Sequence, residues 1–171
     1  MPTDFGKLSA FANPFFDTDK DRCEMWNILV CHDFESFLVA DWASMEGDFF
    51  ADVFCAIDAN DSFDPEKWSL SYPTLESYRH AWTRQAEKFK GLQLENTTMR
   101  DFLYSSARIV NIEIRDSRAL AHKRFDGSAR TIDGETITFR FQSMFEMARR
   151  EGRWGITGFV GYLPLPGTSK S

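Results

Sequence analysis

One stretch near the C-terminus, residues 136–164, constrains the fold of this chain more than any other. From its first residue to Ala148, apolar and polar side chains alternate, and alternation of this length is typical of a β-strand with two different faces. The charged segment 149–153 predicts a hairpin turn, and residues 154–164 predict the returning strand. Because so long and aromatic a hairpin is not stable by itself in water, it must bury one face against helices.

The composition predicts a single soluble domain. The chain has 171 residues, of which 15% are aromatic, so it is long enough to bury a packed core. No apolar run reaches the length of a membrane span, and the N-terminus lacks the basic and apolar segments of a signal peptide. The three cysteines show no paired spacing, which is typical of free thiols in a reducing compartment. We therefore expect a cytoplasmic protein that makes no contact with a membrane.

The formal net charge of −6 disfavours nucleic acids and anionic membranes as partners. The charge is unevenly distributed, because residues 1–75 are strongly acidic and residues 76–171 are net basic. One interpretation is that an acidic helical half packs onto a basic sheet half. The other is that basic side chains line a pocket for an anionic metabolite.

Three helices are predicted in the first half of the chain, after an N-terminal arm formed by residues 1–17. Thr18 resembles a helix N-cap and begins a first helix that reaches about Cys31. We expect the His32-Asp33 pair to break the chain, and a second helix to follow to about Ser44. A third helix is predicted over 74–90, with Gly91 at its C-terminal end.

Strands follow the helices. Segment 45–60 is ambiguous between a short strand with a loop and a continuing helix, and segment 59–73 is turn-rich and predicts a loop. Residues 102–115 and 118–125 have the periodicity of strands. The dipeptides Asp126-Gly127 and Asp133-Gly134 predict turns that flank a loop before the long hairpin.

This order predicts an α+β fold, in which three N-terminal helices pack in a curved, mostly antiparallel, cone-like sheet of four to six strands. The domain is expected to span residues 18–164. Residues 165–171 form a short C-terminal tail after the sheet.

Two segments resemble the nuclear transport factor 2-like superfamily, which includes SnoaL-like polyketide cyclases, ketosteroid isomerases and scytalone dehydratase. They are HDFESFLVADW (32–42) and the hairpin EMARREGRWGITGFVGYLP (146–164), and the likeness extends over about 18–164. The resemblance implies a curved antiparallel sheet wrapped around helices, an apolar pocket at the wide end of this cone, and a homodimer formed through the sheet. The superfamily hosts enzymes, binding proteins and scaffolds, so the fold alone does not assign a function.

The resemblance also suggests catalytic groups. In its isomerase-like members a carboxylate a few residues after the second helix acts as general base. The segment DWASMEGD places Glu46 and Asp48 near this point, although Gly47 occupies the best-aligned position. A carboxylate beside an apolar pocket has a raised pKa, which suits proton abstraction near neutral pH, whereas a carboxylate in a solvated loop does not. His122 is the histidine of a predicted strand and would move a proton or orient a carbonyl group if its face lines the cone.

Aromatic residues are the candidates for ligand contacts. Trp42, Trp68, Tyr78 and Trp82 would form the walls of an aromatic pocket, although core packing explains them equally well. Arg140 projects from the polar face of the long strand, either towards a ligand or into a subunit interface. The spacing of the three histidines does not predict a metal site, and no glycine-rich phosphate loop predicts a nucleotide cofactor.

Two functional hypotheses follow. The first is a cofactor-independent isomerase, cyclase or dehydratase that uses Asp48 or Glu46 as general base and His122 as polar partner on a small hydrophobic or anionic metabolite. The second is a non-catalytic ligand-binding or assembly subunit, similar to the small β subunits of ring-hydroxylating dioxygenases. An enzyme needs a carboxylate or histidine within reach of the ligand, whereas a scaffold does not.

Overall fold

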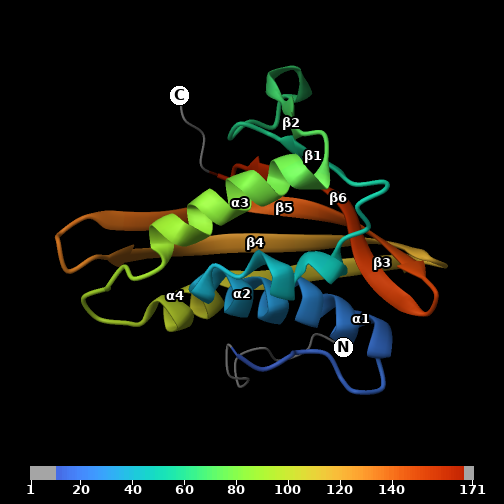
Figure 1. Cartoon of the computed structure of the whole chain (residues 1–171), viewed down its shortest axis with the longest axis horizontal. Helices are drawn as coiled ribbons and strands as arrows, with labels where there is room; N and C mark the ends of the chain where they lie inside the picture. Colours follow the sequence, from blue (N-terminus) through green and yellow to red (C-terminus); the bar gives the residue numbers. More distant parts are fainter. Residues whose placement is uncertain (1–10, 168–171) are drawn as a thin grey trace.

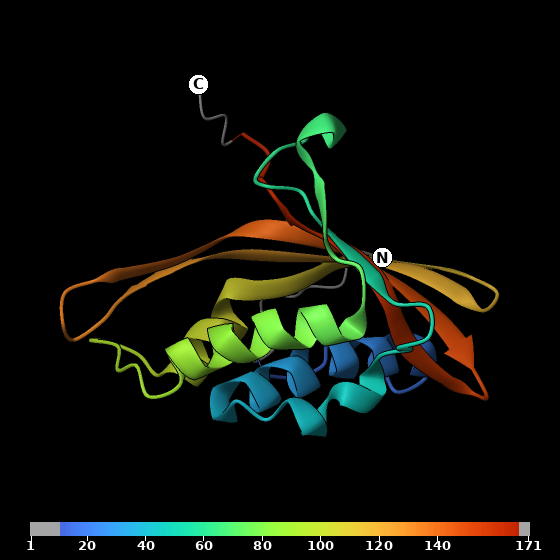
Figure 2. The same cartoon turned by 45° about the horizontal axis from the view of Figure 1, so that its top comes forward.

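The computed structural model describes residues 11–167 and shows an α+β architecture (Figure 1). Most of the predicted N-terminal arm and residues 168–171 of the predicted tail lie outside the described residues. The six strands form one open sheet in the order β2-β1-β6-β5-β4-β3, with all neighbours antiparallel except β1 and β6. Helices pack against one side of this sheet (Figure 2). The predicted α+β class, with N-terminal helices packed against a curved and mostly antiparallel sheet, is confirmed.

The long hairpin is confirmed as the centre of the sheet. Strand β5 (Thr136–Arg150) pairs with β6 (Arg153–Leu163) on one side and with β4 (Arg118–Arg130) on the other. Glu151 and Gly152 form its turn with positive φ values of 51° and 79°. A Gly at the second of these positions adopts the left-handed conformation without a steric cost. The side chains of β5 that face the helices include the phenylalanines of the alternating pattern.

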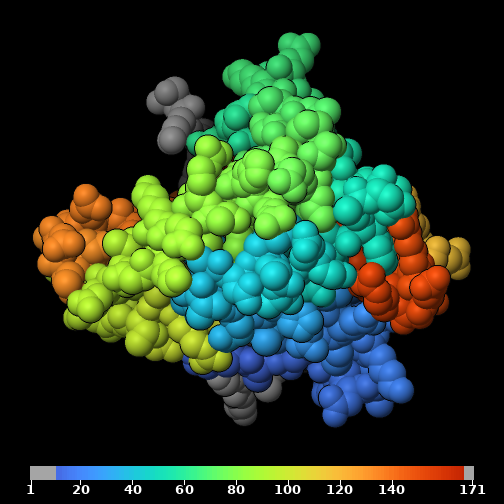
Figure 3. All heavy atoms as spheres, viewed as in Figure 1, coloured from blue at the N-terminus to red at the C-terminus, as the bar shows by residue number. Residues whose placement is uncertain are grey.

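The first helix does not break at His32-Asp33, so this prediction is wrong. Helix α1 (Lys20–Trp26) continues through a π-helical turn (Asn27–His32) into α2 (Asp33–Val39), which ends at Ala40 in the left-handed conformation. An apolar side of this continuous helix packs on the sheet, and that burial outweighs the weak local preference of the His-Asp pair for a boundary. Figure 3 shows α2 lying beside α3 (Leu75–Phe89), the helix that was predicted over 74–90.

The predicted strand over 102–115 is wrong in its first half, because residues 102–106 belong to helix α4 (Met99–Ser106). The side chain of Thr98 caps this helix by accepting a hydrogen bond from Asp101 N–H. Strand β3 (Ala107–Arg115) then pairs with β4.

The turn predicted at Asp126-Gly127 is also wrong, since β4 runs straight through it to Arg130. Helix α4 crosses β4 here, and a Cβ atom on Gly127 would clash with the side chain of Ser106. This glycine therefore permits a close approach rather than a turn. The chain turns at the second predicted site, where Gly134 has a φ of 88°.

Two short strands lie in the segments that the sequence left ambiguous or predicted as a loop. Strand β1 (Cys55–Asp58) pairs in parallel with β6, and β2 (Ser69–Tyr72) adds to its outer edge. Both are only four residues long, and β2 is largely exposed, so neither has the alternating pattern of the long strands.

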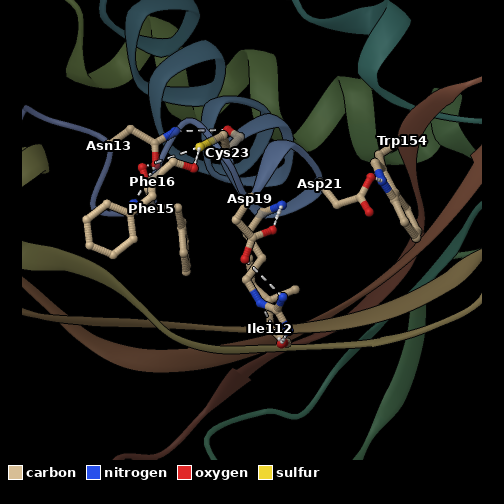
Figure 4. A network of polar contacts seen from close by, with 9 residues as sticks. Asn13, Phe15, Phe16, Asp19, Asp21, Cys23, Ile112 and Trp154 are labelled. Atoms are coloured by element: carbon tan, nitrogen blue, oxygen red, sulfur yellow. Dashed lines mark hydrogen bonds and ion pairs between the residues drawn. The ribbon is translucent and has the colours of Figure 1, made fainter. Parts of the chain in front are cut away.

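Polar contacts attach helix α1 to both halves of the sheet (Figure 4). The guanidinium group of Arg22 donates to the carbonyl oxygen of Ile112 on β3 at 2.9 Å. The indole N–H of Trp154 on β6 donates to Asp21 Oδ1, also at 2.9 Å. Ahead of the helix, Asn13 Nδ2 donates to the carbonyl oxygen of Cys23 and holds the preceding segment against α1.

Within residues 11–167, none of the helices is long and apolar enough to cross a membrane.

The parallel pairing of β1 with β6 gives a first prediction. A Cβ atom on Gly158 would clash with the carbonyl oxygen of its partner Cys55. We expect Gly158→Ala to lower the free energy of unfolding by about 1–3 kcal/mol, the usual cost of overpacking, in urea denaturation. The control is Gly47→Ala, because a Cβ there meets no atom within 4 Å. Equal losses in the two variants would contradict this account.

Candidate functional site

A cavity of about 460 Å³ lies between the helices and the sheet. This volume is in the range of small-molecule binding sites. The sheet contributes a wall of phenylalanines from three adjacent strands: Phe125, Phe139, Phe141, Phe145 and Phe159. Phe34 and Phe37 of α2 and Tyr78 and Trp82 of α3 form the opposite wall. The cavity is therefore lined mainly by aromatic rings.

One charged pair lies inside this aromatic lining. Lys123 points from β4 towards the helices, and its side chain is only 2% exposed. Its Nζ donates to Asp33 Oδ2 at 3.0 Å and to the backbone carbonyl oxygen of Leu29. The same Nζ lies 4.6 Å from the ring centre of Phe34 and 5.0 Å from that of Phe125. These ionic, hydrogen-bonding and cation–π contacts offset the large cost of burying an ammonium group.

The π-helical turn makes the Leu29 carbonyl available to this lysine. In a regular α-helix this carbonyl would accept the backbone N–H of Asp33, four residues later. Here the Asp33 N–H donates to the carbonyl of Val30 instead. Single π-helical turns inside α-helices occur frequently at functional sites, and this one provides a backbone acceptor for a buried cation.

The Asp33 carboxylate remains accessible from the cavity. It accepts a second hydrogen bond, from the indole N–H of Trp82 at 3.3 Å, while its side chain is 27% exposed. Lys123 has three N–H donors, of which two contact Asp33 and Leu29. Among residues 11–167, no hydrogen-bond acceptor is paired with the third. The pair thus offers one basic and one donor group to a ligand.

Three tyrosines add neutral hydroxyl groups to the cavity. Burial raises the pKa of Tyr78 well above its usual value. Loss of water around the hydroxyls also raises the pKa values of Tyr72 and Tyr162, and the negative charge of Asp58 raises both further. These phenols stay protonated at neutral pH, so they can donate hydrogen bonds to a ligand.

The two carboxylates suggested by the resemblance lie outside the main cavity, in a 3₁₀ turn (Glu46–Asp48) before β1. Glu46 is exposed to solvent. Asp48 is mostly buried, and a hydrogen bond of 2.8 Å joins its Oδ2 to His32 Nδ1. Burial raises the pKa of Asp48, although the hydrogen bond from His32 opposes this effect. A separate void of about 20 Å³ is lined by Asp48 and Asp33 together with Tyr78, so Asp48 lies directly behind the cavity.

His122 and Arg140 lie away from the cavity. Side chains alternate along β4, so His122 points to the opposite face of the sheet from Lys123. There its Nε2 is 2.7 Å from Gln142 Oε1. Arg140 is exposed on β5 and forms an ion pair of 3.3 Å with Asp126.

Of the predicted aromatic residues, Tyr78 and Trp82 line the cavity. Trp42 lies behind them in the core, with its ring centre 5.4 Å from that of Trp82. Trp68 is half-buried in the loop before β2, where its indole N–H donates to the carbonyl oxygen of Ser62.

The sequence reasoning did not identify Asp33 and Lys123. A signal was present on β4, because Lys123 shares a face with Ala119, Ala121 and Phe125, and a lysine on an apolar face is unusual. The pairing itself could not be inferred, since the two residues are 90 positions apart.

Comparison with known proteins identifies the fold. No model of a protein family matches the sequence, and no curated protein matches it either. A nuclear transport factor 2-like protein of unknown function from Pseudomonas putida KT2440 is 14% identical, with a TM-score of 0.57 over 92% of this chain and 95% of the other. A proposed aromatic ring hydroxylase from Novosphingobium aromaticivorans is 14% identical, with a TM-score of 0.53 over 86% and 91%.

A proposed calcium/calmodulin dependent protein kinase II association domain from Xanthomonas campestris is similar as well. It is 8% identical, with a TM-score of 0.53 over 94% of this chain and 99% of the other. Identities this low show a shared fold and nothing more. The predicted resemblance to nuclear transport factor 2-like proteins is thus confirmed at the level of the fold.

The buried pair gives a second prediction. We expect Lys123→Met to lower the free energy of unfolding by about 3 kcal/mol, because it leaves the Asp33 carboxylate without its ionic partner. Thermal and chemical denaturation would measure this loss. Arg118→Met on the same strand is the control, since its ion pair with Glu146 is exposed and should contribute less than about 1 kcal/mol. A loss no larger than that of the control would contradict a stabilising role for the pair.

Asp48 gives a prediction on pH. Its pKa is raised by burial above the unfolded value of about 3.9, so the folded state binds the proton more tightly. The stability from this group is present below the unfolded pKa and is lost as pH rises through the folded pKa. We expect the difference in unfolding free energy between the wild type and Asp48→Asn to fall as pH rises from the unfolded pKa through the folded pKa. Denaturation series at stepwise pH would measure this difference.

Asp52 provides a control of opposite sign, because the hydrogen bond from Arg150 lowers its pKa. Relative to Asp52→Asn, the wild type should gain stability as pH rises towards the unfolded value. If this stability difference changed with pH in the same direction at Asp48 and at Asp52, the opposite pKa shifts of the two carboxylates would be contradicted.

Proposed function

We propose that this protein binds a small, largely apolar molecule in the aromatic cavity and acts on it by cofactor-independent acid–base chemistry. The reaction class is that of an isomerase, cyclase or dehydratase, each of which can begin with proton removal beside a carbonyl group. The observation that carries the proposal is the Asp33–Lys123 pair, because it places a carboxylate and an ammonium group in an otherwise aromatic cavity.

Asp33 is the general base in this proposal. Its carboxylate takes a proton from the carbon next to the substrate carbonyl, so that the C–H bond breaks and an O–H bond forms on Asp33. The electron pair of the C–H bond moves towards the carbonyl oxygen and gives an enolate. The third N–H of Lys123 donates to this oxygen and stabilises the new negative charge.

The aromatic walls strengthen both effects. Electrostatic interactions are stronger where few water molecules surround the charges, and Lys123 is almost completely buried among the phenylalanines that line the cavity. Trp82 fixes the orientation of the Asp33 carboxylate through its indole N–H. The base and the donor are therefore held in place before a substrate binds.

Asp48 and His32 would exchange the proton with solvent. The void between Asp33 and Asp48 has a volume of about 20 Å³, which is sufficient for one water molecule, and Tyr78 adds a third polar group to its lining. His32 is 49% exposed and hydrogen-bonded to Asp48, so a proton can pass from solvent to the back of the cavity. Glu46 and His122 have no role in this proposal, because neither lines the cavity.

The alternative is a ligand-binding or assembly subunit without catalysis. Apolar side chains on the outer face of the sheet favour it: Leu120 is 50% exposed, and Met144 and Val160 pair across adjacent strands on that face. A homodimer formed through this face would bury them. The proposed association domain with the same fold is consistent with such assembly.

Proton abstraction can be tested without knowledge of the natural substrate. We expect the protein to catalyse deuterium exchange of the acidic C–H protons of 2-tetralone in D₂O, measured by NMR. Asp33→Asn should lower the exchange rate at least about 100-fold, the usual contribution of a general base. Glu46→Gln is the control and should leave the rate unchanged, because Glu46 is exposed outside the cavity.

A second variant covers the case in which Asp33→Asn fails to fold. Ala81→Phe would fill the cavity from α3 while keeping the Asp33–Lys123 pair, and should abolish exchange. Exchange that persists in folded Asp33→Asn, or that never exceeds the buffer rate in the wild type, would contradict the proposal.

A further inference from the structure

The opening of the cavity carries a charge that the acid–base proposal does not use. Arg84 and Gln85 of α3 are exposed to solvent and also line the cavity. Arg84 has no hydrogen bond or ion pair with another residue in the described range 11–167. Its guanidinium group has five N–H donors in a planar fork that matches the geometry of a carboxylate.

Tyr72 lines the same cavity as Arg84. The positive charge of Arg84 acts against the raised pKa of Tyr72. Tyr72 and Tyr162 also interact with each other, and both line the cavity. Since these phenols are neutral at neutral pH, their hydroxyl groups can donate to an anion together with Arg84.

The carboxylate that acts on both of these tyrosines lies outside the cavity lining. Asp58 acts on both tyrosines, but it does not line the cavity, and its Oδ1 accepts the backbone N–H of Asn60 at 2.7 Å. Within the cavity, the charges of Asp33 and Lys123 offset each other. Arg84 is therefore the one cavity-lining residue in the described chain whose charge has no partner in the lining.

We propose that the natural ligand is a planar aromatic molecule that carries a carboxylate. Its ring system would lie between the phenylalanines of the sheet and the aromatic residues of α2 and α3, where stacked and edge-on contacts are favourable. Its carboxylate would bind Arg84 and Tyr72 at the opening. This inference rests on the proposed function for the cavity as the binding site and adds the chemical class of the ligand.

A matched pair of probes tests the class. Isothermal titration would compare 2-naphthoate with 2-naphthamide, which has nearly the same shape but no charge. We expect the acid to bind about tenfold more tightly, as one charge-assisted hydrogen-bonded contact supplies. Arg84→Gln should remove this preference. Arg79→Gln should retain it, because Arg79 lies on the same helix, is exposed and does not line the cavity.

Ala81→Phe locates the binding, since filling the cavity should abolish it for both probes. Equal affinities of the acid and the amide for the wild type, a preference that survives Arg84→Gln, or binding that survives Ala81→Phe would each overturn the inference.

The test separates this inference from the proposed chemistry. Exchange of 2-tetralone uses an uncharged probe, so loss of the acid preference with intact, Asp33-dependent exchange would overturn only the ligand class. A preference for the acid without any exchange would support the ligand class and overturn the catalytic proposal.

Discussion

The burial of one ammonium group determines much of the arrangement of this protein. Lys123 is almost completely removed from solvent, and an unpaired ammonium group in that position would cost several kcal/mol. The carboxylate of Asp33 and the carbonyl of Leu29 offset this cost, and both come from the helix opposite β4. The lysine therefore connects the sheet to the helical layer at the π-helical turn, and changes to the helix register would leave the charge unpaired.

The same interaction gives the cavity its chemical character. Without the pair, the space between the sheet and α2–α3 would be an aromatic interior of the kind that binds apolar molecules nonselectively. With it, the lining contains a carboxylate and a buried ammonium group, and Arg84 adds an exposed cation. A ligand that satisfies both must combine apolar surface with polar groups, which narrows the chemistry that the site can recognise.

The sequence predicted the elements whose signals are local. Alternation along 136–148 predicted most of β5, and the start at Thr74 with the glycine after the helix predicted α3. It failed at Gly127, where a turn signal stands in a strand because α4 crosses there, and at residues 102–106, where a cap at Thr98 begins a helix. At Gly127 a packing contact between distant segments decides the local conformation, and no window of the sequence contains that contact. The cap at Thr98 is a local signal, which the strand-like periodicity of 102–115 outweighed in the prediction.

The candidate site also divides into features that local sequence signals predict and features that only tertiary packing decides. The sequence by itself determined that an aromatic, α+β domain would form around a long hairpin, because periodicity and turn chemistry act over a few neighbouring residues. Only the tertiary structure decided which face of β4 meets the helices, and hence that Lys123 rather than His122 lines the cavity. It also decided that Asp33 is the partner of that lysine, since residues 90 positions apart are brought together by the packing of helix on sheet. Burial of charge depends on this packing, so the chemistry of the site is a property of the folded molecule.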